Sequence, residues 1–242
     1  LQTLGTLFVL LALWAYLDAR KKQIEGRSGR RGMLLAMLLW LAALGCKEDS
    51  TLLPAYTLAL ELTVLRFDAA NPRLTGTLRR GYWIVALVGI AIFASVVIPH
   101  YWQWDAYDGR DFSTPERLLT QARMLCMYLW QIVVPLPSHM PFFYDWVQPS
   151  RSVLHPWTTL ASIVGSAGLL ALAWYLRRKL PLFAFGIFLF FSAHVITSNV
   201  IGLELAFEHR NHFALIGAVL AIGSLIASVS GRLPLPASAR FA

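Results

Sequence analysis

Residues 203–213, LELAFEHRNHF, place several ionisable side chains between two long apolar runs. Arg210 is the first candidate ligand for a phosphate, because a guanidinium stays charged and binds oxyanions through two parallel hydrogen bonds. Glu208 could orient Arg210 or pair with it, and His209 could donate to the same phosphate or titrate near neutral pH. A structural alternative stays open, in which Arg210 and either Glu204 or Glu208 neutralise each other.

A second pair of opposite charges, Lys47 and Glu48, lies in the short polar segment KEDST. The Lys47 ammonium could hold a phosphate through charged hydrogen bonds, or it could form a structural ion pair with Glu48 or Asp49. Lys47 is therefore the second candidate phosphate ligand, with Glu48 as its supporting carboxylate.

Asp145 lies in the proline-rich, aromatic segment VVPLPSHMPFFYDWVQP. Four prolines between positions 135 and 149 prevent a continuous helix there. Irregular backbone at membrane depth is tolerated only when it is buried in protein or lines a wet cavity. We therefore expect Asp145 to face a cavity and to support the site, with an ordinary surface aspartate as the alternative.

The elements that must position these residues are apolar helices. The chain has 242 residues, of which 57% are hydrophobic and only 14% charged, whereas a soluble domain carries about a quarter charged residues. Since a bilayer core needs roughly 20 apolar residues per helix, we predict an all-α, polytopic transmembrane helix bundle with about seven spans. The spans are 2–17, 33–46, 52–65, 81–98, 157–176, 180–197 and 213–230. The second and third are short and could instead form a buried hairpin of two helices.

Basic residues mark one set of loops. If the seven spans alternate, fifteen of the 21 Lys and Arg residues fall on one side of the membrane, and the positive-inside rule makes that side cytoplasmic. Their dispersal over several loops excludes a nucleic-acid-binding surface despite the net charge of +8. The opposite, extracytoplasmic side collects most of the acidic residues and the histidines, so any chemistry is expected there. Cys46 and Cys126 also lie on that side, where they could form a disulfide or remain free.

This topology divides the chain into four parts. Residues 1–98 hold four spans, 99–156 form a long extracytoplasmic segment, 157–230 hold three spans and 231–242 form a cytoplasmic tail. In the long segment Asp105, Asp108 and Asp111 offer oxygen ligands for calcium, but their spacing differs from that of an EF-hand. A divalent metal is therefore possible but unsupported, and a solvated loop is favoured.

An amphipathic helix is predicted within the long segment. The sequence STPE supplies either a capping box from Ser113 to Glu116 or Thr114 as the cap with Pro115 in the first turn. The helix would end at Pro135 and lie at the interface or re-enter the membrane. Its apolar side carries Leu118, Ala122, Leu125, Leu129 and Ile132, and its other side carries Arg117, Gln121, Met124, Tyr128 and Gln131.

Two polar residues interrupt the apolar runs. His194 is expected to be a hydrogen-bonded core histidine, and Glu61 is expected to reach the interface by snorkelling. Glycines in IVGSAGLLALAW and LIGAVLAIGSLIAS predict close contacts between helices through small residues.

Four stretches, in order along the chain, resemble one family. They are QTLGTLFVLLALWAYLDAR, LGCKEDSTLLP, RLLTQARMLCMYLWQIVVPLPSHMPFFYDW and TSNVIGLELAFEHRNHF. Together they resemble the membrane part of the GT-C-type glycosyltransferases, especially the transmembrane-and-tetratricopeptide-repeat O-mannosyltransferases and their bacterial relatives. The third contains an Arg-Leu-Leu-Thr start and an Asp-Trp end, and the fourth a Glu-x-Arg signature.

The resemblance implies an integral protein of the bacterial inner membrane with its active face outside the cytoplasm. It implies transfer of a mannose-like sugar from a polyprenyl-phosphate donor to a protein or glycan acceptor, as in protein O-glycosylation, with no cofactor assigned. The family's general base is an Asp in a first outer loop, which would precede residue 1, so the chain is expected to be a fragment that lacks this base. The alternative function is a non-catalytic membrane subunit, or a binder or transporter of lipid-linked glycans.

Overall fold

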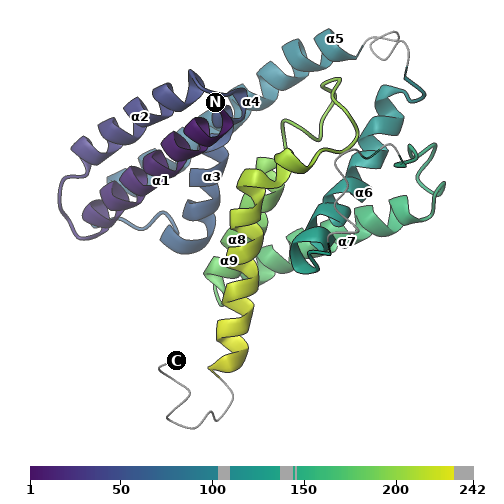
Figure 1. The fold of residues 1–242 in the computed structure, drawn as a ribbon. Coiled ribbons are helices and arrows are strands. Elements are labelled where there is room, and N and C mark those ends of the chain that lie inside the picture. Colours follow the sequence, from purple (N-terminus) through teal and green to yellow (C-terminus); the bar gives the residue numbers. More distant parts are fainter. Residues whose placement is uncertain (103–109, 137–143, 145, 232–242) are drawn as a thin grey trace.

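The computed structural model describes residues 1–102, 110–136, 144 and 146–231, and their regular secondary structure is entirely helical (Figure 1). This confirms the predicted all-α class for the described residues. The 3-10 helices are η1 and η5, and the π-helices are η2 and η3. The elements are α1 (Gln2–Ile24), α2 (Arg30–Leu44), η1 (Glu48–Leu52), α3 (Leu53–Leu60), η2 (Glu61–Leu65), α4 (Pro72–Ile92), η3 (Phe93–Val97), α5 (Ile98–Tyr101), α6 (Thr114–Val133), α7 (Thr158–Leu176), α8 (Pro181–Ala193), η5 (Glu208–Arg210) and α9 (Asn211–Ser230).

Four helices of the described chain are long and apolar enough to cross a membrane: α1, the continuous helix Pro72–Tyr101, α7 and α9. The predicted count of seven spans is not confirmed. The helix α2 has 15 residues and α8 has 13, which is below the roughly 17 that a bilayer needs. The helix α8 ends at Ala193, and the chain turns over residues 194–198.

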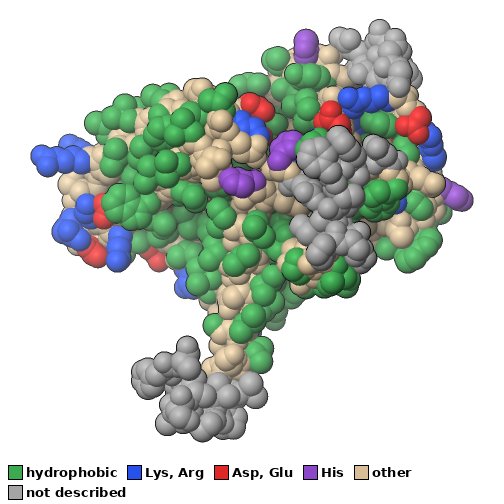
Figure 2. Space-filling model, in the orientation of Figure 1, with side chains coloured by type: hydrophobic (Ala, Val, Ile, Leu, Met, Phe, Trp, Pro, Cys, Tyr) green, Lys and Arg blue, Asp and Glu red, His purple; other side chains and the backbone are tan. Residues whose placement is uncertain are grey.

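Many large hydrophobic side chains are exposed, and they are spread widely over the face shown in Figure 2. On Pro72–Tyr101 no residue of the most apolar window is buried inside the protein, and Trp83 is 70% exposed. A surface of this kind is unfavourable in water but matches the interior of a bilayer. The four long apolar helices and this exposed apolar surface indicate a membrane protein.

Two pairs of helices pack most closely: α1 with α2, and α8 with α9 (Figure 1). In the second pair a Cβ atom at Gly186 would lie 2.3 Å from the Gly217 carbonyl oxygen, and one at Gly217 would lie 2.5 Å from the Gly186 oxygen. The predicted small-residue contact is therefore confirmed at Gly217. It is wrong for Gly165, Gly168 and Gly223, which have no atom within 4 Å of such a Cβ.

A buried ion pair joins α1 to η2. Arg20 Nε donates to Glu61 Oε1 at 2.6 Å, and Tyr16 donates to the same oxygen at 2.6 Å. The Phe67 amide donates to Glu61 Oε2 at 3.0 Å, while Arg20 Nη2 also donates to the Asp68 carbonyl at 2.8 Å. Both charged side chains are 0% exposed. The prediction that Glu61 snorkels is wrong, because its carboxylate lies inside the protein and accepts hydrogen bonds there from Tyr16, Arg20 and the Phe67 amide.

The helix α6 begins at the predicted capping box, with the Ser113 amide donating to Glu116 Oε2 at 2.8 Å. This hydrogen bond holds the pKa of Glu116 below its usual range. The more polar side of α6 is the buried side, whereas its leucines are only partly buried. Such inverted polarity fits a helix with lipid on one side and the polar loops of its own chain on the other. The buried residues of α6 are Thr114, Arg117, Thr120, Gln121, Met124, Tyr128 and Gln131.

The helix ends form two groups. One, called here the Arg210 end, joins the N-termini of α1 and α9, where Gln2 Nε2 donates to the His209 carbonyl at 3.0 Å. The other, called here the Arg178 end, joins η2 to the C-terminus of α7, where Arg66 Nη2 donates to the Arg178 carbonyl at 3.1 Å. Cys46 and Cys126 are free cysteines.

The first prediction concerns the glycine contact. Gly217→Ala places a Cβ against backbone of α8, so we expect a loss of about 1–3 kcal/mol from overpacking and a lower thermal unfolding midpoint in detergent. Gly223→Ala is the matched control on the same helix, because it gains helix propensity and meets no atom. Equal midpoints for the two variants would contradict the close contact.

The second prediction concerns the buried pair. Glu61→Gln removes the negative charge and leaves Arg20 buried without compensation, so we expect a loss of about 3–5 kcal/mol. Thermal unfolding in detergent measures this. Glu25→Gln is the control, since Glu25 pairs with Arg27 on an exposed surface and should leave the midpoint unchanged. A Glu61→Gln midpoint equal to that of the parent would remove the pair from the stability of the fold.

Candidate functional site

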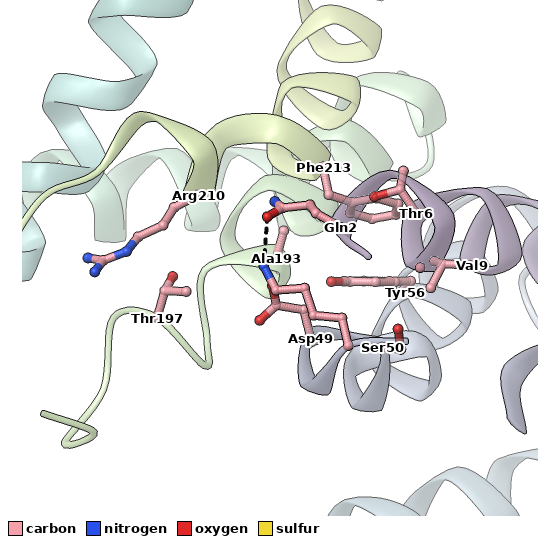
Figure 3. Close-up of a pocket in the computed structure, with 12 residues that line it drawn as sticks. Gln2, Thr6, Val9, Asp49, Ser50, Tyr56, Ala193, Thr197, Arg210 and Phe213 are labelled. Atoms are coloured by element: carbon pink, nitrogen blue, oxygen red, sulfur yellow. Dashed lines mark hydrogen bonds and ion pairs between the residues drawn. The ribbon is translucent and has the colours of Figure 1, made fainter. Parts of the chain in front are cut away.

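A small cavity at the Arg210 end collects residues from distant parts of the chain (Figure 3). Its volume is about 40 Å³, which is room for a few water molecules and not for a sugar. It opens beside the first turns of α1 and α9 and the segment of η1. The residues that line it are Gln2, Gly5, Thr6, Val9, Lys47, Asp49, Ser50, Tyr56, Ala193, Thr197, Arg210 and Phe213.

Lys47 is positioned by the extended backbone that precedes η1. Its ammonium lies 3.0 Å from Asp49 Oδ2 and donates to Gln2 Oε1 at 2.9 Å. Glu48, the predicted supporting carboxylate, is exposed, so Asp49 takes the place that was expected of Glu48. The structural alternative for Lys47, an ion pair with Asp49, is thus formed in this structure.

Arg210 borders the same cavity at the N-terminus of α9. Its side chain is only 3% exposed, and Nη1 donates to the Glu204 carbonyl at 2.7 Å while Nη2 lies 3.2 Å from Glu204 Oε2. Figure 3 shows the guanidinium directed away from Gln2 and Asp49. Burial lowers the pKa of Arg210, yet a guanidinium remains charged at neutral pH. The partner is therefore Glu204; the side chain of Glu208 lies outside the described residues.

His209 precedes Arg210 in η5 and is exposed, but it is not among the residues that line the cavity. Its backbone carbonyl accepts the hydrogen bond from Gln2, and its ring centroid lies 4.4 Å from that of Phe207. Burial, followed by the positive charges of Lys47 and Arg210, lowers the pKa of His209. Near neutral pH the imidazole is therefore uncharged and able either to donate or to accept one hydrogen bond.

The helix α6 holds the loop that carries Arg210. Arg117 donates to three backbone carbonyls of this loop, those of Thr197, Asn199 and Leu203, at 3.0, 2.8 and 3.1 Å. The Tyr128 hydroxyl accepts from the Phe207 amide at 2.8 Å. A buried arginine that satisfies three carbonyls fixes irregular backbone that would otherwise be unpaired. The amphipathic pattern of α6 could have indicated these residues, but not which side faces the protein.

His194 follows the last residue of α8 and is the hydrogen-bonded core histidine that was expected. It is 1% exposed, its Nδ1 lies 3.0 Å from the Phe190 carbonyl oxygen, and its ring stacks on Tyr128 with centroids 5.4 Å apart. Sequence reasoning missed Gln2, Thr6 and Tyr56, which reach the cavity because the tertiary structure brings them against His209, His212 and Phe213.

Asp145 lies outside the described residues, as do Asp105 and Asp108, so the roles expected of these side chains remain predictions. Within the described part of the chain, no three His, Cys, Asp or Glu residues are grouped closely enough to hold a metal ion. The candidate site consists of Lys47 and Arg210, each paired with a carboxylate, together with the neighbouring His209 and Gln2.

The third prediction concerns His209. Because Lys47 is one cause of its lowered pKa, Lys47→Met should raise the pKa of His209, measured by NMR titration with His209→Gln for assignment. Lys179→Met, at the other end of the helices, should leave it unchanged. Because the pKa of His209 is lower in the folded than in the unfolded protein, the unfolded protein binds the proton more strongly. The stability that neutral His209 contributes is therefore lost as the pH falls below the ordinary histidine pKa of about 6.5. An unchanged titration in Lys47→Met would contradict the proximity of the two charges.

Comparison with known proteins assigns this site to no family. No protein-family model, curated protein or solved structure matches the chain. The chemistry available at the Arg210 end therefore follows from its own cations, carboxylates and size.

Proposed function

We propose that the chain is part of a membrane glycosyltransferase and that its Arg210 end holds the phosphate of a polyprenyl-phosphate sugar. The observation that carries the proposal is the position of Lys47 and Arg210. Both were predicted as phosphate ligands from separate stretches, and both border one cavity at the ends of apolar helices. The resemblance of four stretches to GT-C-type enzymes supports the same assignment.

An incoming phosphate must compete with the carboxylates that now hold these cations. Glu204 is the weaker competitor, because its side chain is 61% exposed and meets Arg210 at 3.2 Å, whereas Asp49 is 32% exposed and meets Lys47 at 3.0 Å. A phosphate that replaced Glu204 could accept two hydrogen bonds from the guanidinium. Gln2 lies beside the Lys47 ammonium, with Oε1 accepting from Lys47 and Nε2 donating to the His209 carbonyl, so its amide would have to exchange a partner to donate to the phosphate.

The transfer itself would proceed at the rim of the cavity. The acceptor hydroxyl oxygen would bond to the anomeric carbon of the sugar, the bond from that carbon to the phosphate oxygen would break, and the hydroxyl proton would pass to a base. The phosphate leaves with an added negative charge, which fixed cations stabilise. The cavity of about 40 Å³ accommodates phosphate oxygens, while the sugar lies outside it and the prenyl chain along the apolar helices.

A binder or transporter of lipid-linked glycans is the second candidate. It is favoured by one observation: Asp49 is the one carboxylate among the described residues that line the cavity, and it is already engaged by Lys47 at 3.0 Å. In that case the same residues would bind the donor without transfer. The two candidates share the phosphate site and differ in whether sugar reaches an acceptor.

The fourth prediction tests the shared phosphate site. In the full-length protein, Arg210→Ala should weaken binding of a short-chain polyprenyl-phosphate mannose by about tenfold or more, since a charged hydrogen bond contributes about 1.5–3 kcal/mol. Glu204→Gln should strengthen binding, because it removes the competing carboxylate. Arg151→Ala, which alters an exposed pair with Glu116, is the control.

Binding would be measured by the quenching of tryptophan fluorescence in detergent, and transfer by release of the polyprenyl phosphate. Unchanged donor affinity in a folded Arg210→Ala variant would exclude Arg210 from the site. Normal binding with no transfer in the parent protein would select the binder or transporter.

A further inference from the structure

A second cavity lies at the Arg178 end, between α4, η2 and the C-terminus of α7. Its volume is about 720 Å³, within the range of roughly 300–1,000 Å³ that is usual for sites of small ligands. One part of its wall is apolar and aromatic and includes Leu62, Trp83 and Trp174. The other part carries four arginines: Arg66, Arg79, Arg177 and Arg178.

The positive charge of this wall is not neutralised by the protein. None of the four arginines forms an ion pair within the described part of the chain. The lining contains two carboxylates, and Glu61 is already paired with Arg20, which leaves Asp68. Four cations facing one available carboxylate create a site that favours an anion.

The backbone that presents Arg66 is strained. Arg66 and Phe67 have φ values of 56° and 59°, in the left-handed region that residues with a Cβ rarely adopt. The turn is held by the hydrogen bond from the Phe67 amide to Glu61 Oε2 and by the bond from Arg66 to the Arg178 carbonyl. Such strain persists where surrounding contacts enforce it, and it is concentrated at binding sites. Here it brings two arginines from distant segments to one wall.

Two further arginines are stacked on aromatic rings of the same region. The Arg177 guanidinium carbon lies 3.7 Å from the Trp174 ring centroid, and that of Arg79 lies 5.7 Å from the Phe67 centroid. Stacking fixes a guanidinium plane while its edge stays available for hydrogen bonds. The wall therefore suits a phosphate with several oxygens.

The other side of the cavity is bounded by α4, which contacts the rest of the chain through Thr75 and Tyr82 but buries no residue. Trp83 and Leu87 are 70% and 61% exposed. In Figure 1 this helix leads from the α3–η2 region up into α5. A ligand in the cavity would thus touch an arginine wall at one end and a long apolar helix beyond it.

We propose that this cavity binds one anionic phospholipid, with its phosphate and its additional negative charge against the arginines and its acyl chains along α4. The combination of charge and apolar length selects a lipid over a free phosphate. Basic pockets between membrane helices commonly hold the headgroups of anionic lipids. The site is separate from the Arg210 end and does not depend on the function proposed for it.

The fifth prediction uses the chain in detergent with added lipid. Native mass spectrometry should detect one retained phosphatidylglycerol, and phosphatidylcholine should be retained much less. The double variant Arg79→Gln/Arg178→Gln should weaken retention roughly 25-fold, because each arginine near an anionic lipid contributes a factor of about five. The double variant Arg73→Gln/Arg80→Gln is matched in charge and on α4, but its residues do not line the cavity, so it should retain the lipid.

Several outcomes would overturn the proposal. Equal losses in the two double variants would mean that only the total charge matters. Equal retention of phosphatidylcholine would exclude recognition of the negative charge. Displacement of phosphatidylglycerol by soluble glycerol phosphate at similar concentration would show that the phosphate alone is bound. A dimer that forms through α4 in the absence of lipid, measured by mass, would show that a second copy covers this face.

Discussion

The pairing of Arg20 with Glu61 is the interaction on which the rest of the structure depends. A carboxylate and a guanidinium, both without exposed surface, compensate each other inside the protein, and removing either one would leave the other without its partner. Glu61 also ties the Phe67 amide, and Arg20 also ties the Asp68 carbonyl. One polar cluster therefore fixes α1 against η2 and holds the strained turn that brings Arg66 beside Arg178.

Two helices differ from the usual surface helix of a soluble protein. The helix α6 buries its more polar side and leaves its leucines partly exposed, while α4 buries nothing. This arrangement is stable when lipid is the surroundings, because polar backbone and charged side chains then find partners only within the protein. Arg117 illustrates the consequence, since it satisfies three carbonyls of the loop before Arg210.

The cations at the Arg210 end and at the Arg178 end differ in the partners that the described chain provides for them. At the Arg210 end each cation has a carboxylate, Glu204 for Arg210 and Asp49 for Lys47, so an anion must displace a partner that is already there. At the Arg178 end the arginines have backbone and aromatic contacts but no carboxylate within the described chain. The Arg210 end, where a ligand competes with a carboxylate, suits a ligand that binds and dissociates. The Arg178 end, where no carboxylate is paired with the arginines, suits a ligand that remains bound.

The sequence by itself determined the helical class, the membrane environment and the cap of α6, because hydropathy, helix length and capping are local properties. It also pointed to Lys47 and Arg210, since charges at the ends of apolar runs are conspicuous. Only the tertiary structure decided which charges meet. Glu61 pairs with Arg20 instead of snorkelling, and Arg210 takes Glu204, because helix packing and loop geometry set distances between side chains far apart in the chain. The lengths of α2 and α8 were decided in the same way, by turns that hydropathy alone does not locate.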